Sequence, residues 1–192
     1  MESIILASSS PRRKQILEKY GLKHSVVESK IDEKIHLEDN PEQIAMSLAF
    51  EKAYNVAMAN RESIVIGADT IVVFENQVLG KPRDELDAMR ILNLLSGKEH
   101  VVITGISLLN LKKEIKIVDF ERTIVKFREL DDDIINRYID TREPFDKAGA
   151  YGIQGYGALF VEKIDGCYYN VIGLPLGKLS QLLYRYFNIS II

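Results

Sequence analysis

The pattern of apolar and polar positions predicts strands alternating with helices along the chain. Apolar or β-branched runs predict strands at residues 4–7, 24–27, 63–74, 101–111, 115–127, 159–164 and 168–172. Segments with helical periodicity and capping residues predict helices at residues 11–20, 41–60 and 173–187, one that Asp84 or Asp87 caps and that ends at residue 95, and another that begins near residue 131. This order favours an α/β protein whose mixed, strongly twisted sheet is flanked by helices.

Glycine, proline and asparagine mark the turns between these elements. Gly21 suits the position after a helix, and Asn40 followed by proline suits a helix start. Asn76-Gln77 predicts a hairpin turn, and Asp165-Gly166 predicts another between the last two strands. Because no linker or internal repeat separates the elements, we expect one domain over residues 1–192.

The first strand-to-helix connection combines serines, a proline and basic residues. Ser8 and Ser10 precede Pro11, which suits the first helical position, and Arg12 and Arg13 follow in the first turn. Cations are unfavourable there because a helix N-terminus is already positive. A bound phosphate removes this conflict, so the stretch predicts a phosphate site; the alternative is a solvated basic turn.

Two charged residues lie at positions that are otherwise apolar. Asp69 is at the centre of the strand predicted at 63–74. Burying an unpaired carboxylate there would destabilise the fold by roughly several kcal/mol. Gly67 leaves space nearby for a ligand or another backbone. Lys52 falls within the apolar stripe of the second helix. The alternatives are a structural Asp69 and a Lys52 that extends from a half-buried face to solvent.

Two further loops are candidates for ligand contact. Gly80 and Pro82 flank Lys81, and residues 146–157 contain four glycines with aromatic residues between them. Without a run of serine or proline, the second segment favours an ordered ligand loop over a linker.

Composition narrows the function classes. A net charge of −3 and a pI near 5.7 argue against a broad nucleic-acid surface. One cysteine and three histidines without ligand spacing disfavour a zinc enzyme. No signal peptide or run of about 20 apolar residues occurs, so we expect a cytoplasmic protein with no membrane partner.

Loops that follow parallel strands gather at one edge of such a sheet. We therefore expect Arg12, Arg13, Lys52 and Lys81 to lie near Asp69, a set that suits a polyphosphate with a divalent metal. No Walker A motif or Ser/His/Asp triad is present.

The chain resembles the Maf family of nucleoside triphosphate pyrophosphatases over nearly its whole length. The shared motifs are S-x-S-P-R-R at 8–13, K-A at 52–53, G-A-D-T at 67–70, L-G-K-P at 79–82, L-S-G-x-x-H-x-V-x-T at 95–104, K-A-G-A-Y-G-I-Q-G at 147–155 and G-L-P at 173–175.

The resemblance implies hydrolysis between the α- and β-phosphorus atoms of a nucleoside triphosphate, and an elongated two-lobed fold shared with the inosine triphosphatases. The I-Q-G version of the glycine-rich loop resembles the subgroup that acts on dTTP and UTP, with modified pyrimidine nucleotides as further candidates. The resemblance also implies a homodimer and a role in limiting non-standard nucleotides.

By this resemblance Asp69 accepts the proton of the attacking water, and three residues match positions of substrate choice: Arg12, Thr70 and Gln154. We expect Mg²⁺ or Mn²⁺ to be held by Glu33 and Asp69. We expect the phosphates to be bound by Ser8, Ser10, Arg13, Lys52 and Lys81. The amide of Gln154 matches the O4/N3–H edge that thymine and uracil share.

Two other functions stay open. A transferase or phosphosugar enzyme would use the same basic pocket but release orthophosphate or a transferred group. A non-catalytic nucleotide-binding regulator of cell division and septum formation would keep its role in an Asp69→Asn variant, whereas water activation would fail.

Overall fold

A computed structural model describes residues 2–31 and 40–192. Its strands are β1 (Ile4–Leu6), β2 (Ser25–Val26), β3 (Ile64–Phe74), β4 (Gln77–Leu79), β5 (Glu99–Asn110), β6 (Ile115–Phe127) and β7 (Val161–Asp165). Its α-helices are α1 (Pro11–Lys19), α2 (Pro41–Ala59), α3 (Glu85–Leu95), α4 (Asp132–Asp140), α5 (Tyr168–Ile172) and α6 (Leu176–Phe187). Three 3₁₀ helices follow α4: η1 (Glu143–Asp146), η2 (Ala148–Ala150) and η3 (Tyr156–Phe160).

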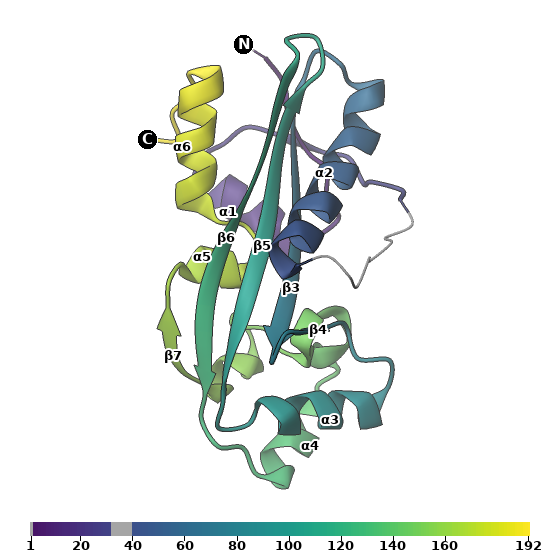
Figure 1. Ribbon diagram of the computed structural model, residues 1–192, viewed down its shortest axis with the longest axis vertical. Coiled ribbons are helices and arrows are strands. Elements are labelled where there is room, and N and C mark those ends of the chain that lie inside the picture. The colour runs from purple at the N-terminus through teal and green to yellow at the C-terminus, as the bar shows by residue number, and fades with distance from the viewer. Residues whose placement is uncertain (1, 32–39) are drawn as a thin grey trace. The chain divides into compact units, whose positions relative to one another are not determined.

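The strands form one seven-stranded sheet in the order β2-β1-β3-β5-β6-β7, with β4 paired to β3 (Figure 1). β1 is parallel to both β2 and β3, whereas β4 is antiparallel to β3 and β7 is antiparallel to β6. The predicted α/β class with a mixed, helix-flanked sheet is therefore confirmed.

The chain divides into two compact units, and β3, β5 and β6 contribute residues to both. Unit 1 comprises residues 1–69, 104–121 and 173–192, and unit 2 comprises residues 70–103 and 122–172. The expected single domain with two lobes stays a prediction.

In unit 1, α2 packs closely on the sheet because small residues face each other. A Cβ added to Gly67 on β3 would overlap the carbonyl oxygen of Ala49 and lie 2.8 Å from the Cβ of Ala53. A Cβ on Gly105 of the neighbouring strand β5 would overlap the backbone of Ala45 in the same way. We call these five residues the small-residue seam; they bring the helix backbone against the strands.

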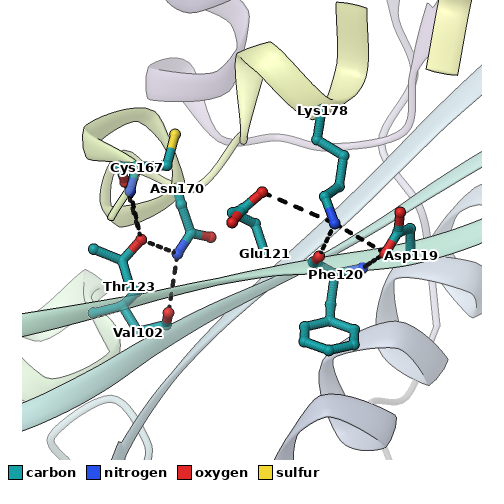
Figure 2. A network of polar contacts seen from close by, with 8 residues as sticks. All are labelled: Val102, Asp119, Phe120, Glu121, Thr123, Cys167, Asn170 and Lys178. Carbon is teal, nitrogen blue, oxygen red and sulfur yellow. Dashed lines mark hydrogen bonds and ion pairs between the residues drawn. The ribbon is translucent and has the colours of Figure 1, made fainter. Parts of the chain in front are cut away.

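α6 is tied to β6 by a lysine, also within unit 1. Lys178 Nζ donates to the Oδ1 atom of Asp119 at 3.0 Å and to the carbonyl of Phe120 (Figure 2). The carboxylate of Glu121 lies 3.9 Å away. In the view of Figure 1, α2 and α6 lie on either side of β5 and β6.

Unit 2 has its own apolar core. The core combines residues of β3, β5 and β6 with α3, α4 and the segments that follow α4; its fully buried large side chains include Leu92, Leu95, Phe127 and Phe160. α3 begins at the side chain of Asp84, which accepts from the N–H of Asp87 at 2.8 Å. This confirms the predicted helix through Leu95.

The prediction of a strand at 168–172 is wrong, because these residues form α5. Thr123 Oγ1 accepts from the N–H of Cys167 at 3.0 Å and donates to the Cys167 carbonyl at 3.2 Å (Figure 2). The buried amide of Asn170 donates to Thr123 Oγ1 and to the carbonyl of Val102, both at 2.9 Å. These tertiary hydrogen bonds stabilise one helical turn in a sequence with β propensity.

The predicted turn at Asp165-Gly166 therefore does not join two strands. The first of those strands begins later than expected, since residues 156–160 form η3 and only Val161–Asp165 pairs with β6. The hairpin turn after β3 is displaced by one residue: Phe74 pairs with Gln77, and Glu75 and Asn76 both have positive φ. Two positive φ values match a type I′ turn.

The helix boundaries near the amino end agree with the prediction. Asn40 Oδ1 accepts from the N–H of Gln43 at 2.8 Å and caps α2. Gly21 has φ +70° and closes the end of α1. No helix in the described part of the chain is both long enough and apolar enough to cross a membrane.

Candidate active site

The register of β1 and β3 brings the first loop beside Asp69. The two strands are parallel, with Leu6 opposite Ile66, and the N–H of Ala7 donates to the Ile66 carbonyl at 2.8 Å. β1 ends there, whereas β3 continues, so the residues after Ala7 leave the sheet alongside Gly67 to Asp69. The carboxyl end of a parallel strand is a common place for ligand-binding loops.

Lys52 and Asp69 form an ion pair in unit 1. The small-residue seam holds α2 against β3, and Lys52 adjoins Ala53 on that helix while Asp69 lies two residues beyond Gly67. Lys52 Nζ therefore reaches Oδ1 of Asp69, and both side chains are largely shielded, with exposures of 15% and 12%. The pair offsets much of the cost of placing a carboxylate among apolar strands.

Arg13 is held by two contacts on the same side of α1. Its Nε donates to the carbonyl of Gly173 at 2.7 Å, and Nη1 donates to Ser8 Oγ at 3.0 Å. Ser8 Oγ also accepts from the N–H of Ser10 at 3.2 Å. Ser8 and Arg13 are both buried, so the guanidinium is oriented before any ligand arrives.

The other predicted residues of this loop lie near the same strand end. Ser10 occupies the N-cap position of α1, but its side chain makes no capping hydrogen bond. Arg12 is half-buried in the first helical turn, and Thr70 is half-buried directly after Asp69. Hydrogen bonds thus join Ser8 to Ser10 and Arg13, and an ion pair joins Lys52 to Asp69. That these two groups and Arg12 meet at one phosphate site stays a prediction.

Lys81 and Gln154 belong to unit 2, where both are exposed. The N–H of Gly149 donates to the carbonyl of Gly80 at 3.0 Å, which joins the glycine-rich segment to the loop of Lys81. The predicted proximity of Lys81 to Asp69 and the predicted role of Gln154 in substrate choice stay predictions.

The start of the glycine-rich segment is anchored in the core of unit 2. The hydroxyl of Tyr151 and Nε2 of His100 share a hydrogen bond of 2.8 Å, and both rings contact Phe127 edge to face. Burial lowers the pKa of His100 to about 4 and raises the pKa of Tyr151. His100 is therefore neutral at neutral pH and serves as a buried core group.

The predicted metal ligand Glu33 lies outside the described residues. Within residues 2–31 and 40–192, no group of three or more His, Cys, Asp or Glu side chains could hold a metal ion. Asp69 is a hard oxygen donor at the strand end, and Mg²⁺ is commonly bound by one or two carboxylates together with substrate phosphates. The donor chemistry thus fits a metal ion that arrives with a polyphosphate.

Two parts of this arrangement were not predicted from the sequence. The motif G-L-P at 173–175 was interpreted only as a helix start, although the Gly173 carbonyl orients Arg13. Glu143, whose carboxylate contacts the glycine-rich segment, was not singled out. The role of Gly173 left no local signal, because it depends on a contact with a residue far away in the sequence. Glu143 did leave a signal, since it is an acidic residue just before a glycine-rich loop.

Together these features define an α/β protein with an oriented guanidinium and a lysine–carboxylate pair at the carboxyl end of parallel strands, as expected for binding phosphate groups. The profile of the family described as Maf-like protein matches residues 3–186. The chain belongs to this family.

Curated relatives match the chain over almost its full length. A protein of Clostridioides difficile strain 630 named dTTP/UTP pyrophosphatase is 52% identical over 189 residues, which is 98% of this chain and 97% of the relative. Proteins of the same name from Alkaliphilus oremlandii and Acetivibrio thermocellus are 50% and 49% identical. Both alignments cover 100% of this chain; they cover 100% of the Alkaliphilus oremlandii protein and 98% of the Acetivibrio thermocellus protein.

Among solved structures, the Ham1 protein of Staphylococcus aureus matches with a TM-score of 0.47 and 14% identity, covering 66% of this chain and 72% of the other.

Proposed function

We propose that the protein hydrolyses dTTP and UTP to the nucleoside monophosphate and pyrophosphate. Membership of the Maf-like family and the shared name of relatives near 50% identity support this nucleotide diphosphatase activity. The observation that carries the proposal is the shielded ion pair between Lys52 and Asp69, together with the oriented Arg13 of the same unit.

In this proposal the basic residues bind the triphosphate and stabilise the leaving pyrophosphate. Arg13 is already oriented by Gly173 and Ser8, so it can bind phosphate oxygens with little loss of side-chain entropy. Lys52 has three N–H donors and can bind a phosphate oxygen while it stays near Asp69. Such preorganised charge lowers the barrier to breaking a phosphoanhydride bond.

Asp69 is proposed as the proton acceptor for the attacking water. The water oxygen attacks the α-phosphorus, the α–β bridging oxygen leaves with pyrophosphate, and the water proton passes to the Asp69 carboxylate. The ammonium of Lys52 contacts Oδ1 of that carboxylate and holds the side chain in position before the reaction. A divalent cation such as Mg²⁺ or Mn²⁺, bound by the phosphates and by Asp69, would supply additional neutralisation of phosphate charge.

Base selection is proposed for Gln154, with Arg12 and Thr70 as further residues that set substrate choice. The amide of Gln154 offers one donor and one acceptor, which complement O4 and N3–H of thymine and uracil. Cytosine presents an amino group and an unprotonated N3 at these positions, so its pattern is reversed. Comparable turnover of dTTP and CTP would contradict this assignment.

An Asp69→Asn variant tests the catalytic proposal. The amide keeps the shape but accepts a proton poorly, so we expect kcat to fall by about 10²–10⁴ while nucleotide binding persists. Release of pyrophosphate from dTTP, UTP and CTP is measured with Mg²⁺ and with Mn²⁺, and binding is followed by calorimetry. Glu114→Gln, the corresponding acid-to-amide change at an exposed residue of the same unit, is the control and should keep the wild-type rate.

Other outcomes separate the alternatives. Release of orthophosphate or transfer of a group, with no pyrophosphate, would indicate the transferase or phosphosugar reading. Unchanged activity of Asp69→Asn in a cell-division assay would favour a non-catalytic regulator. The homodimer, action on modified pyrimidine nucleotides and the link to cell division stay predictions, and light scattering tests the first of them.

A further inference from the structure

The backbone of the glycine-rich loop in unit 2 is folded around one carboxylate. The N–H of Tyr156 donates to Oε2 of Glu143 at 2.9 Å, and the N–H of Gly157 donates to Oε1 at 3.3 Å. The hydroxyl of Tyr138, on α4, donates to the same Oε1 at 3.0 Å. Three donors from two segments therefore converge on the Glu143 side chain, and hydrogen bonds to an ionised acceptor are stronger than those to a neutral one.

The glycines of this loop are required by that packing. A Cβ on Gly155 would overlap the Glu143 carboxylate, and a Cβ on Gly152 would lie 2.6 Å from Cε of Lys147. A Cβ on Gly157 would lie 2.7 Å from the carbonyl oxygen of Gly152. Gly152 and Gly155 thus provide space for the backbone to approach charged side chains, and Gly157 lets it approach the backbone of Gly152, so the loop is ordered by close contact.

The hydroxyl of Tyr138 extends the contact to the beginning of the loop. It receives a backbone hydrogen bond from Gly152, and burial together with the Glu143 charge raises the pKa of Tyr138. Lys147 Nζ donates to the Glu143 carbonyl and to Asp146 Oδ1, both at 2.6 Å. Backbone contacts at Gly152, Tyr156 and Gly157 therefore lie on both sides of Gln154 in sequence.

Gln154 itself is exposed, so its position depends on the backbone around it. We propose that Glu143 is a positioning residue for base selection, holding residues 152–157 in the conformation that presents the Gln154 amide to the pyrimidine. This inference rests on the proposed function of Gln154. A site that recognises a base by hydrogen bonds discriminates only while its donor and acceptor are held in place.

A Glu143→Gln variant tests the inference. The amide keeps the size of the side chain but replaces one acceptor oxygen with a donor, so at least one of the three converging donors loses its acceptor. We expect kcat/KM for dTTP and UTP to fall about tenfold through KM, as for the loss of one charged hydrogen bond, with kcat retained. The value for CTP should stay unchanged, so discrimination against CTP shrinks about tenfold.

Hydrogen exchange gives a second readout on the same variant. Amides of residues 152–157 should exchange faster, with wild-type exchange on α3. Glu162→Gln, the same chemical change at an exposed residue of β7, is the matched control and should alter neither exchange nor discrimination. If Glu143→Gln fails to fold, Tyr138→Phe removes one donor to Glu143 and the acceptor of the Gly152 backbone hydrogen bond, and it should move both readouts in the same direction.

Gln154→Ala separates the two proposals. If this variant keeps the wild-type ratio of dTTP to CTP turnover, base recognition by Gln154 is overturned, and the role of Glu143 with it. If Gln154→Ala abolishes discrimination but Glu143→Gln and Tyr138→Phe retain it, only the positioning role of Glu143 is overturned.

Discussion

The two units hold their candidate functional groups in different ways. In unit 1, Lys52, Asp69 and Arg13 are shielded side chains that contact other groups directly. In unit 2, Gln154 is exposed, and the structure around it consists of backbone contacts to the Glu143 carboxylate. The unit 1 charges proposed to act on phosphates, which all nucleotides share, thus lie on the sheet and its helices, whereas the group proposed to read the base is carried on a loop.

This difference predicts two kinds of variant. Changes at Lys52, Asp69 and Arg13 should lower the rate for every nucleotide by the same factor, and changes around Gln154 should alter the ratio between nucleotides. A variant that mixes the two effects would contradict this division of roles.

Lys52→Met should have a larger effect than the two changes that follow. It removes an ammonium from the proposed phosphate site and leaves Asp69 without its ion-pair partner. We expect kcat/KM to fall by about 10²–10³ for dTTP, UTP and CTP alike, comparable with the loss of one preorganised electrostatic contact. Steady-state kinetics on the three nucleotides measures this, with the exposed Lys23→Met in the same unit as control. A changed ratio of dTTP to CTP turnover would break the division.

Acid should destabilise the protein through His100 in unit 2. The pKa of His100 is about 4 when folded and near its ordinary 6.5 when unfolded, so between these pH values the unfolded chain binds more protons. The free energy of unfolding should be fully retained above about pH 6.5 and fall by roughly 3 kcal/mol as the pH drops to about 4.

Denaturant unfolding from pH 4 to 7.5 checks this expectation. A His100→Phe variant should lose this component of the pH dependence, and His24→Gln should retain it. If wild-type and His100→Phe show the same slope, another group causes the acid sensitivity.

Gly173→Ala should have the smallest effect. Gly173 has φ +113°, which alanine adopts only with strain of about 1–3 kcal/mol. We expect a loss of stability in this range and a higher KM for all nucleotides, because displacement of the Gly173 carbonyl reorients Arg13. Gly177→Ala is the control: it is on α6 with nothing within 4 Å of an added Cβ, and alanine favours a helix. An unchanged KM in Gly173→Ala would show that Arg13 needs no such support.

Local patterns predicted the parts of the fold whose causes are local. Asn40 with Pro41, and Asp84 before α3, mark helix starts correctly because a cap acts within three residues. The apolar run of β3 was equally clear, and Asp69 was recognisable as a charge inside it. Lys52 could be assigned because the helical period placed it on the buried face of α2.

Where contacts between residues distant in the chain determine the local structure, the sequence alone did not predict it. Tyr168–Ile172 has the composition of a strand, but Thr123 and Asn170 hold it as a helical turn. The Gly173 carbonyl acquires its role only when it meets Arg13, 160 residues away in the chain. The proposed role of Gln154 came from the family resemblance. The contacts of its loop with Glu143 could not be predicted, because they form only when the loop folds around that carboxylate.

The small-residue seam limits how this protein can vary. Helix and strands meet there with no space for one more carbon at Gly67 or Gly105. In a library randomised at both positions and selected for growth or activity, we expect glycine to be recovered almost exclusively, even though glycine has no side chain with which to bind a nucleotide. Attempts to redesign substrate preference should therefore leave this seam intact and diversify the loop of Gln154.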